Sequence, residues 1–322
     1  MSSLLSLCLL LSLPPVATFS IVAIDPANGD LGVTVASRYF SVGSVVPWAE
    51  AGVGAVATQA NVNVGYGPRA IELLKQGLTA PQALKKLQEE DAFEGKDGRQ
   101  IAIVDAKGNI AAYTGPAAQK WAGDKQGKTW SAQGNILVGE QVVEAMGRAF
   151  ESTQGELAEK LFAALQAGDD AGGDSRGRQS ASLLVVRKQG GRNTNNDRYI
   201  FINADDHPEP VKELRRLLDM NLTYLYQDQT FKLARAGKLR EARDAMARAA
   251  GYSPSNPGLV MQAGFLSYRI GDKPAALEAF LKAKSLNPKF KEAWDAVLRR
   301  PDNKALAADL EFIKMLFPEV DK

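Results

Sequence analysis

Hydrophobic and polar residues form short strand-like runs over the first two thirds of the chain. Residues 18–25 are rich in β-forming side chains, Asn28-Gly29 favours a turn, and residues 31–37 form a returning strand. Residues 52–60 are nearly all apolar, which predicts a strand buried on both faces. Further strands are predicted at residues 99–106, 110–114, 130–138, 182–188 and 199–203.

Helical patterns separate these strands in two places. Residues 69–75 and 81–90 form one predicted helix pair, and residues 140–150 and 155–166 form the other. Because the strands arrive as hairpins with helix pairs between them, the order predicts an α+β domain with two helix layers. A doubly wound βαβ repeat fits this order less well.

The polar, proline-containing segment 204–210 precedes a region that is helical throughout. Small residues and proline recur there at a spacing of 34, as Gly237 and Gly271, Ala242 and Ala276, Ala249 and Ala283, and Pro254 and Pro288. This period resembles the tetratricopeptide repeat and predicts a domain that binds a protein or peptide partner. A helical extension of the first domain is the alternative. We expect a leader at 1–17, a mixed domain at 18–205, a linker and connecting helix at 206–220, and repeats at 221–322.

The amino-terminal residues are typical of a secretory leader. Residues 4–13 are mostly apolar but too few to span a bilayer, and a small residue, Ala17, ends the segment. We therefore predict export to the periplasm or the medium. The segment 1–3 has no Lys or Arg, so a misassigned start or another apolar leader stays open. Removal of this leader would also remove Cys8, the only cysteine.

Composition excludes several classes of function. The chain has 322 residues with 39 Lys and Arg against 37 Asp and Glu, so its net charge of +2 provides no basic field for nucleic acid. One histidine and one cysteine exclude a zinc site built from several such ligands. A Ser-His-Asp triad is disfavoured because only His207 could act as its base. We expect no metal, no cofactor and no transmembrane segment.

Cleavage after Ala17 would place Thr18 at the new amino terminus, at the head of a strand. An N-terminal threonine joins nucleophile and base in one residue, because its hydroxyl attacks while its α-amine accepts the proton. The ordinary pKa of an α-amine, about 7.7–8.0, is close to working pH. A threonine that merely begins a strand is the alternative interpretation.

Several motifs in order resemble a widespread bacterial family, called in words domain of unknown function ten-twenty-eight. The motifs lie at residues 18–23, 46–60, 66–69, 99–100, 133–135 and 171–181. The resemblance implies the fold of the N-terminal-nucleophile hydrolases, a four-layer αββα sandwich. It names no substrate, although the peptidoglycan-binding modules of some members hint at a role in the cell envelope.

A more distant likeness to proteasome β-subunits adds a Ser-Arg pair at the end of the second strand, here Ser37 and Arg38. Those enzymes place a lysine beside the threonine, but this chain has no lysine between Thr18 and Lys75. Arg38 and Glu50 are the charged residues nearest in sequence to that place. Both are predicted to contact substrate, together with Ser37.

Further site residues follow from the needs of acyl transfer. The tetrahedral intermediate requires oxyanion donors, for which Asn61 and Asn135 are predicted, with Asn63 beside the substrate. Asp174, Arg176 and Ser180, on and after a glycine-rich loop, are predicted to hold a substrate carboxylate or the loop itself. Asparagines in turns and a structural ion pair are the alternatives.

Two hypotheses result. The first is an exported N-terminal-threonine amidohydrolase that acts on an amide or peptide-like substrate, with Thr18 as nucleophile. The second is a non-catalytic scaffold that keeps the hydrolase fold, which the missing lysine favours. A homo-oligomer is compatible with either.

Overall fold

The computed structural model describes residues 18–193 and 195–318. The predicted leader and Cys8 lie outside the described residues. The chain divides into two compact units, the first ending at Arg216 and the second beginning at Leu217. Both sheets belong to the first unit, and the second unit is helical, which confirms the mixed α+β class.

A six-stranded antiparallel sheet has β1 (Thr18–Asp25) near its centre. β1 pairs with β2 (Asp30–Ser37) on one side and with β8 (Trp130–Asn135) on the other. The strand order is β10-β9-β2-β1-β8-β7, in which the remaining strands are β9 (Ser180–Val186), β10 (Arg198–Ala204) and β7 (Gly123–Gln126). The predicted amino-terminal hairpin is therefore confirmed, with Thr18 at one end of a central strand.

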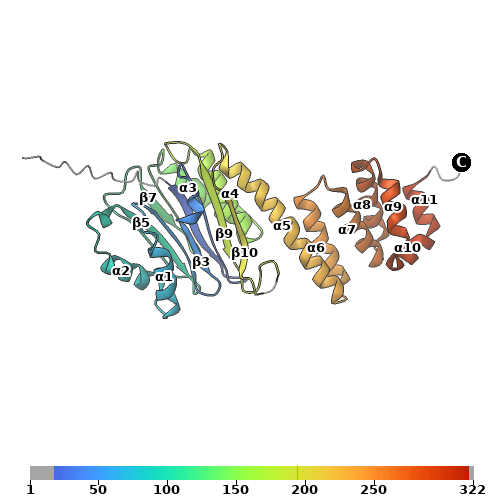
Figure 1. Cartoon of the computed structure of the whole chain (residues 1–322), viewed down its shortest axis with the longest axis horizontal. Coiled ribbons are helices and arrows are strands. Elements are labelled where there is room, and N and C mark those ends of the chain that lie inside the picture. Colours follow the sequence, from blue (N-terminus) through green and yellow to red (C-terminus); the bar gives the residue numbers. More distant parts are fainter. Residues whose placement is uncertain (1–17, 194, 319–322) are drawn as a thin grey trace, which may run out of the picture. The chain divides into compact units, whose positions relative to one another are not determined.

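The second sheet has four antiparallel strands. Its order is β3 (Pro47–Glu50), β4 (Gly54–Ala60), β5 (Arg99–Asp105) and β6 (Ile110–Thr114). The two sheets pack face to face over an apolar core (Figure 1). The six-stranded sheet contributes Val22, Val33 and Val35 to this core, and the four-stranded sheet contributes Ala57, Ala102 and Val104.

Helix pairs cover the outer faces of both sheets. The helices α1 (Tyr66–Lys75) and α2 (Ala80–Glu90) pack on the four-stranded sheet through a second apolar cluster that includes Leu74, Leu84 and Ile101. The helices α3 (Gln141–Ser152) and α4 (Leu157–Asp170) pack on the six-stranded sheet. Two helix layers therefore enclose two sheets.

The sequence prediction missed two edge strands and misplaced several strand ends, that of β8 by three residues. β3 has four residues and begins with a proline, and β7 is polar, so neither has the apolar alternation of a strand. The predicted strand at 130–138 ends at Asn135 because Ile136 adopts a φ of 52°, outside the extended region.

In the second unit, as far as residue 318, six helices and a short 3₁₀ turn follow the boundary helix α5 (Pro210–Arg235). They are α6 (Leu239–Tyr252), α7 (Pro257–Arg269), α8 (Lys273–Leu286), α9 (Phe290–Leu298), α10 (Lys304–Ala308) and α11 (Leu310–Leu316). Gly237 and Gly271 have positive φ in the turns before α6 and α8, and Ala276, Ala283 and Phe280 are buried. Among the described residues, no helix is long and apolar enough to cross a membrane.

Candidate active site

Thr18 lies between two strand ends that the sheet places beside it. It pairs with Ser37 of β2 and with Asn135 of β8, and all three residues are buried. The Thr18 Oγ1 donates a hydrogen bond of 3.2 Å to the Ser37 Oγ. Because side chains alternate along a strand and Val22 faces the other sheet, Thr18 also lies on that inner face. Three predicted site residues, Thr18, Ser37 and Asn135, are thus brought together.

A buried polar layer continues from Thr18 into the space between the sheets. The Ser20 Oγ donates to the Gln59 Oε1 at 2.6 Å and accepts from the Gln133 Nε2 at 2.7 Å. The Gln59 Nε2 in turn donates to the Thr18 carbonyl oxygen at 3.4 Å. Buried amides of this kind are stable only when paired, so the layer fixes the start of β1 against both sheets.

Gln100 is the centre of this layer. Its Oε1 accepts from the Gln59 Nε2 at 2.8 Å and from the Asn135 Nδ2 at 3.1 Å, and its Nε2 donates to the Gly134 carbonyl oxygen at 2.8 Å. The Asn135 side chain is therefore held in one orientation. Its Oδ1 is buried and has no hydrogen-bond partner among the described residues. An unpaired acceptor thus lies on the residue that is directly opposite Thr18.

The sequence analysis did not select Ser20, Gln59, Gln100 or Gln133. One feature of the sequence could have indicated them: a glutamine at an inward position of a largely apolar strand, as at Gln59 in β4. A buried glutamine side chain requires hydrogen-bond partners, and in this fold they come from residues of both sheets. The motifs 99–100 and 133–135 contained two of these residues, but the strand register that joins them is not visible in the sequence.

The glycine-rich loop forms a cluster around Asp174, beside Ser37. The Asp174 carboxylate accepts from the Arg38 backbone N at 2.8 Å and forms an ion pair of 3.0 Å with the Arg176 Nη2. Arg38 and Arg176 also bond each other's carbonyl oxygens, the Arg38 Nη1 donating to the Arg176 oxygen at 2.8 Å. The structure thus brings Asp174, Arg176 and Arg38 together, directly after Ser37, as a loop held by an ion pair.

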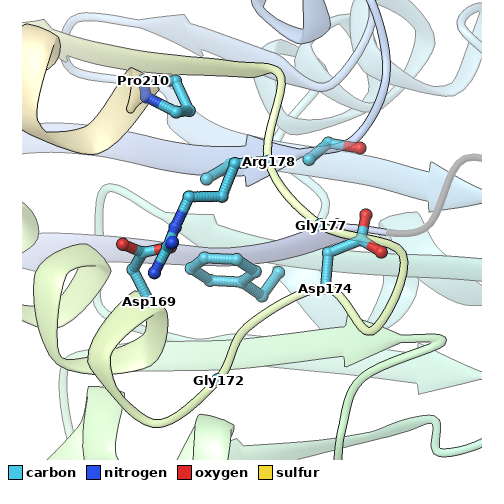
Figure 2. Close-up of a pocket in the computed structure, with 9 residues that line it drawn as sticks. Asp169, Gly172, Asp174, Gly177, Arg178 and Pro210 are labelled. Carbon is cyan, nitrogen blue, oxygen red and sulfur yellow. The ribbon is translucent and has the colours of Figure 1, made fainter. Parts of the chain in front are cut away.

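A cavity of about 110 Å³ lies beside this cluster (Figure 2). Its lining includes Ser37, Asp174, Gly177 and Arg178. Figure 2 shows the Arg178 side chain extending toward Asp169, and the two form an ion pair of 2.7 Å. This hydrogen bond to Asp169 raises the pKa of the Arg178 guanidinium. Ser37 lines the cavity and contacts Thr18, but Thr18 is not part of the lining, and Phe19 and Ala36 of the lining lie on the opposite face of the sheet from the Thr18 side chain.

Other predicted residues have different partners. The Ser180 Oγ accepts from the Val42 backbone N at 3.1 Å and donates to the Tyr39 carbonyl oxygen, so it joins β9 to the segment after β2. Glu50 forms an exposed ion pair of 2.8 Å with Lys75. It pairs with Gly54, at the opposite end of β4 from the polar layer, and is not part of the Thr18 cluster.

Asn61 and Asn63 follow β4 as predicted, but their side chains hold the loop. The Asn61 Nδ2 donates to the Gly95 carbonyl oxygen at 3.2 Å, and the Asn63 Oδ1 accepts from the Gly65 N at 3.1 Å. These contacts fit the alternative of asparagines in turns better than a role beside the oxyanion.

A buried ion pair between Arg99 and Asp91 holds the loop that contains Asn61. Arg99 lies 3.0 Å from Asp91 and also donates to the Asn61 carbonyl oxygen. Burial raises the pKa of Asp91, but hydrogen bonds from Tyr66, the Phe93 N and Arg99 outweigh burial, and the pKa is lowered. Burial and the bond to Asp91 raise the pKa of the Tyr66 hydroxyl. At neutral pH the Asp91 carboxylate is therefore ionised, whereas the Tyr66 hydroxyl keeps its proton.

Among the described residues, no group of His, Cys, Asp and Glu side chains is arranged to hold a metal ion. The sequence over residues 18–214 matches the family described as Family of unknown function (DUF1028). The chain belongs to this family. This confirms the resemblance that the motifs indicated.

A solved DUF1028 structure is similar to this chain. It is the crystal structure of protein SPO2555 from Silicibacter pomeroyi, with 30% sequence identity and a TM-score of 0.57. The similarity covers 63% of this chain and 88% of that protein. No curated protein matches. The DUF1028 comparisons therefore identify the family without naming an activity.

Proposed function

We propose that this protein is an exported N-terminal-threonine amidohydrolase acting on an amide or peptide-like substrate. One observation is central: Thr18 begins a central strand with its Oγ1 3.2 Å from the Ser37 Oγ and with Asn135, whose Oδ1 is unpaired, directly opposite. A terminus at Thr18 would convert its backbone nitrogen into an α-amine beside this acceptor. The two sheets between helix pairs are compatible with the N-terminal-nucleophile hydrolase sandwich.

The proposed reaction uses one residue as nucleophile and base. The α-amine accepts the Thr18 hydroxyl proton as the Oγ1 attacks the amide carbonyl carbon. The resulting ammonium then protonates the leaving amine, and an acyl ester remains on Thr18. Water, deprotonated by the same amine, cleaves the ester and releases the acid.

Asn135 has a different role in this proposal from the one expected from the sequence. Its Nδ2 already donates to the Gln100 Oε1 at 3.1 Å, and its Oδ1 lacks a partner. We assign the Oδ1 as the acceptor for a hydrogen bond from the α-amine. Such a bond would orient the nitrogen lone pair toward the Thr18 hydroxyl.

The helical second unit supports a binding role. Its buried Ala242, Ala249, Ala276 and Ala283 stand at the 34-residue spacing, and both turn glycines have positive φ. We propose tetratricopeptide-like repeats that hold a protein or peptide partner.

The non-catalytic scaffold is the second candidate function. It is favoured by the absence of lysine from residues 19–74 and by the use of the Asp174 and Ser180 side chains to hold loops. A threonine without a neighbouring lysine depends on its own amine as the base.

A hydroxyl-reactive β-lactone distinguishes the two functions. We expect it to acylate Thr18 in the native protein, with the adduct located by peptide mass spectrometry. Thr18→Ala should abolish the adduct, whereas Thr18→Ser, which keeps a hydroxyl, should retain it. Equal labelling of the native and T18A proteins would favour the scaffold.

A further inference from the structure

We infer that the hollow lined by Arg38 and Arg178, which adjoins the cavity beside Ser37, binds a carboxylate of the substrate through Arg38, so that the substrate is an acidic amide. This inference rests on the proposed function of Thr18. It adds the chemical class of the group that the enzyme would recognise.

Position is the first argument. Ser37 lines the 110 Å³ cavity and contacts the Thr18 Oγ1, and Arg38 is the next residue. Arg38 lines a neighbouring hollow of about 290 Å³. Arg178 lines both spaces, so the two are adjacent. Arg38 therefore follows directly after the residue that contacts the proposed nucleophile.

Charge is the second argument. Each carboxylate that lines the first cavity forms an ion pair with an arginine. Asp174 pairs with Arg176 at 3.0 Å, and Asp169 pairs with Arg178 at 2.7 Å. Within the described part of the chain, no carboxylate lies within ion-pair distance of the Arg38 guanidinium. Of Arg38, Arg176 and Arg178, Arg38 therefore forms no ion pair with a described carboxylate.

The second hollow also contains one acid and the single histidine. The Asp206 carboxylate accepts from the Gln179 Nε2 at 3.2 Å, and the His207 Nδ1 accepts from the Glu209 N at 3.0 Å. Both groups are thus already held by hydrogen bonds to neighbouring residues. Neither is paired with Arg38.

The third argument is preorganisation. The Arg38 backbone is fixed by Asp174 and Arg176, and its Nη1 donates to the Arg176 carbonyl oxygen at 2.8 Å. Gly177 has a φ of 110°, and a Cβ there would lie 3.0 Å from the Arg38 Nη1. The glycine thus lets the guanidinium lie against the backbone. A held guanidinium binds a planar carboxylate at a low entropic cost.

The test measures binding in the Thr18→Ala protein, where turnover cannot interfere. The probes are N-acetylglutamate methylamide and its neutral counterpart, N-acetylglutamine methylamide, which have the same shape. Calorimetry should show about tenfold tighter binding of the acid, as a charge-assisted hydrogen bond provides. Arg38→Gln should remove this preference. Arg148→Gln, at an exposed arginine of α3, is the matched control and should keep it.

A second measurement needs no variant at this site. Phenylglyoxal modifies exposed arginines, and the acid probe should protect Arg38 in the unaltered protein while the amide probe does not. Equal affinity for the two probes, a preference that R38Q leaves unchanged, or absence of protection would overturn the inference. Binding is measured in the T18A protein and therefore does not depend on the Thr18 hydroxyl. If the acid probe binds more tightly but the lactone does not label the native protein, only the hydrolase proposal is refuted.

Discussion

At the scale of single residues, the polar layer around Thr18 is the most unusual feature of the molecule. Gln59, Gln100 and Gln133 are fully or almost fully buried between two sheets that pack over an apolar core. Burial of an amide is costly unless each of its atoms is paired, and here nearly all are. The exception is the Asn135 Oδ1, next to the proposed nucleophile.

Gln100→Leu should destabilise the protein by about 3 kcal/mol, since it leaves the Gly134 oxygen and the Asn135 Nδ2 without partners. Urea unfolding at neutral pH measures the loss. Gln126→Leu, at an exposed position of β7, is the control and should change stability by less than about 0.5 kcal/mol. Equal stability of Q100L and the unaltered protein would show that the layer is not held by Gln100.

The site residues could be predicted only where local sequence determined their place. Thr18 was selected as the residue that loss of the leader would expose, Ser37 from a likeness to proteasome β-subunits, and Asn135 as an oxyanion donor. The strand register brings the three together. The pairing of Gln59 with Gln100 joins residues 41 apart, and no local pattern specifies it. The side chain of Asn61 could not be placed either, because its partner Gly95 lies in a separate 3₁₀ turn (Glu94–Gly98).

At the scale of elements, periodicity predicted the long strands and helices, whereas the short edge strands were missed. β1, β2, β4 and β5 have apolar inward faces that the sequence displays. β7 reads Gly-Asp-Lys-Gln, and only its pairing with β8 makes it a strand. The strand conformation of β7 therefore depends on its tertiary contacts and not on the propensity of its residues.

Helix packing gives a prediction at this scale. A Cβ at Gly147 of α3 would lie 2.3 Å from the Trp130 ring, so Gly147→Ala should cost about 1–3 kcal/mol despite the better helix propensity of alanine. Gly251 of α6 has no heavy atom within 4 Å of the equivalent position, and Gly251→Ala should stabilise by up to about 1 kcal/mol. Thermal unfolding of both variants tests the packing, and a stabilised G147A would contradict it.

At the scale of the whole molecule, two units have separate cores. The sheets enclose one apolar cluster, and Phe280, Trp294 and Phe312 form another in the helical unit. The family match ends at residue 214, close to the boundary after Arg216. The chemistry that we propose therefore belongs to the DUF1028 region, and the partner binding that we propose belongs to the helical unit.

The most direct test is the amino-terminal residue of the protein purified from its native source. N-terminal sequencing with intact-mass measurement should give Thr18 as the first residue, since the proposed base is its α-amine. A preparation that hydrolyses an amide or reacts with the lactone at Thr18 while residues before Thr18 remain attached would contradict the mechanism.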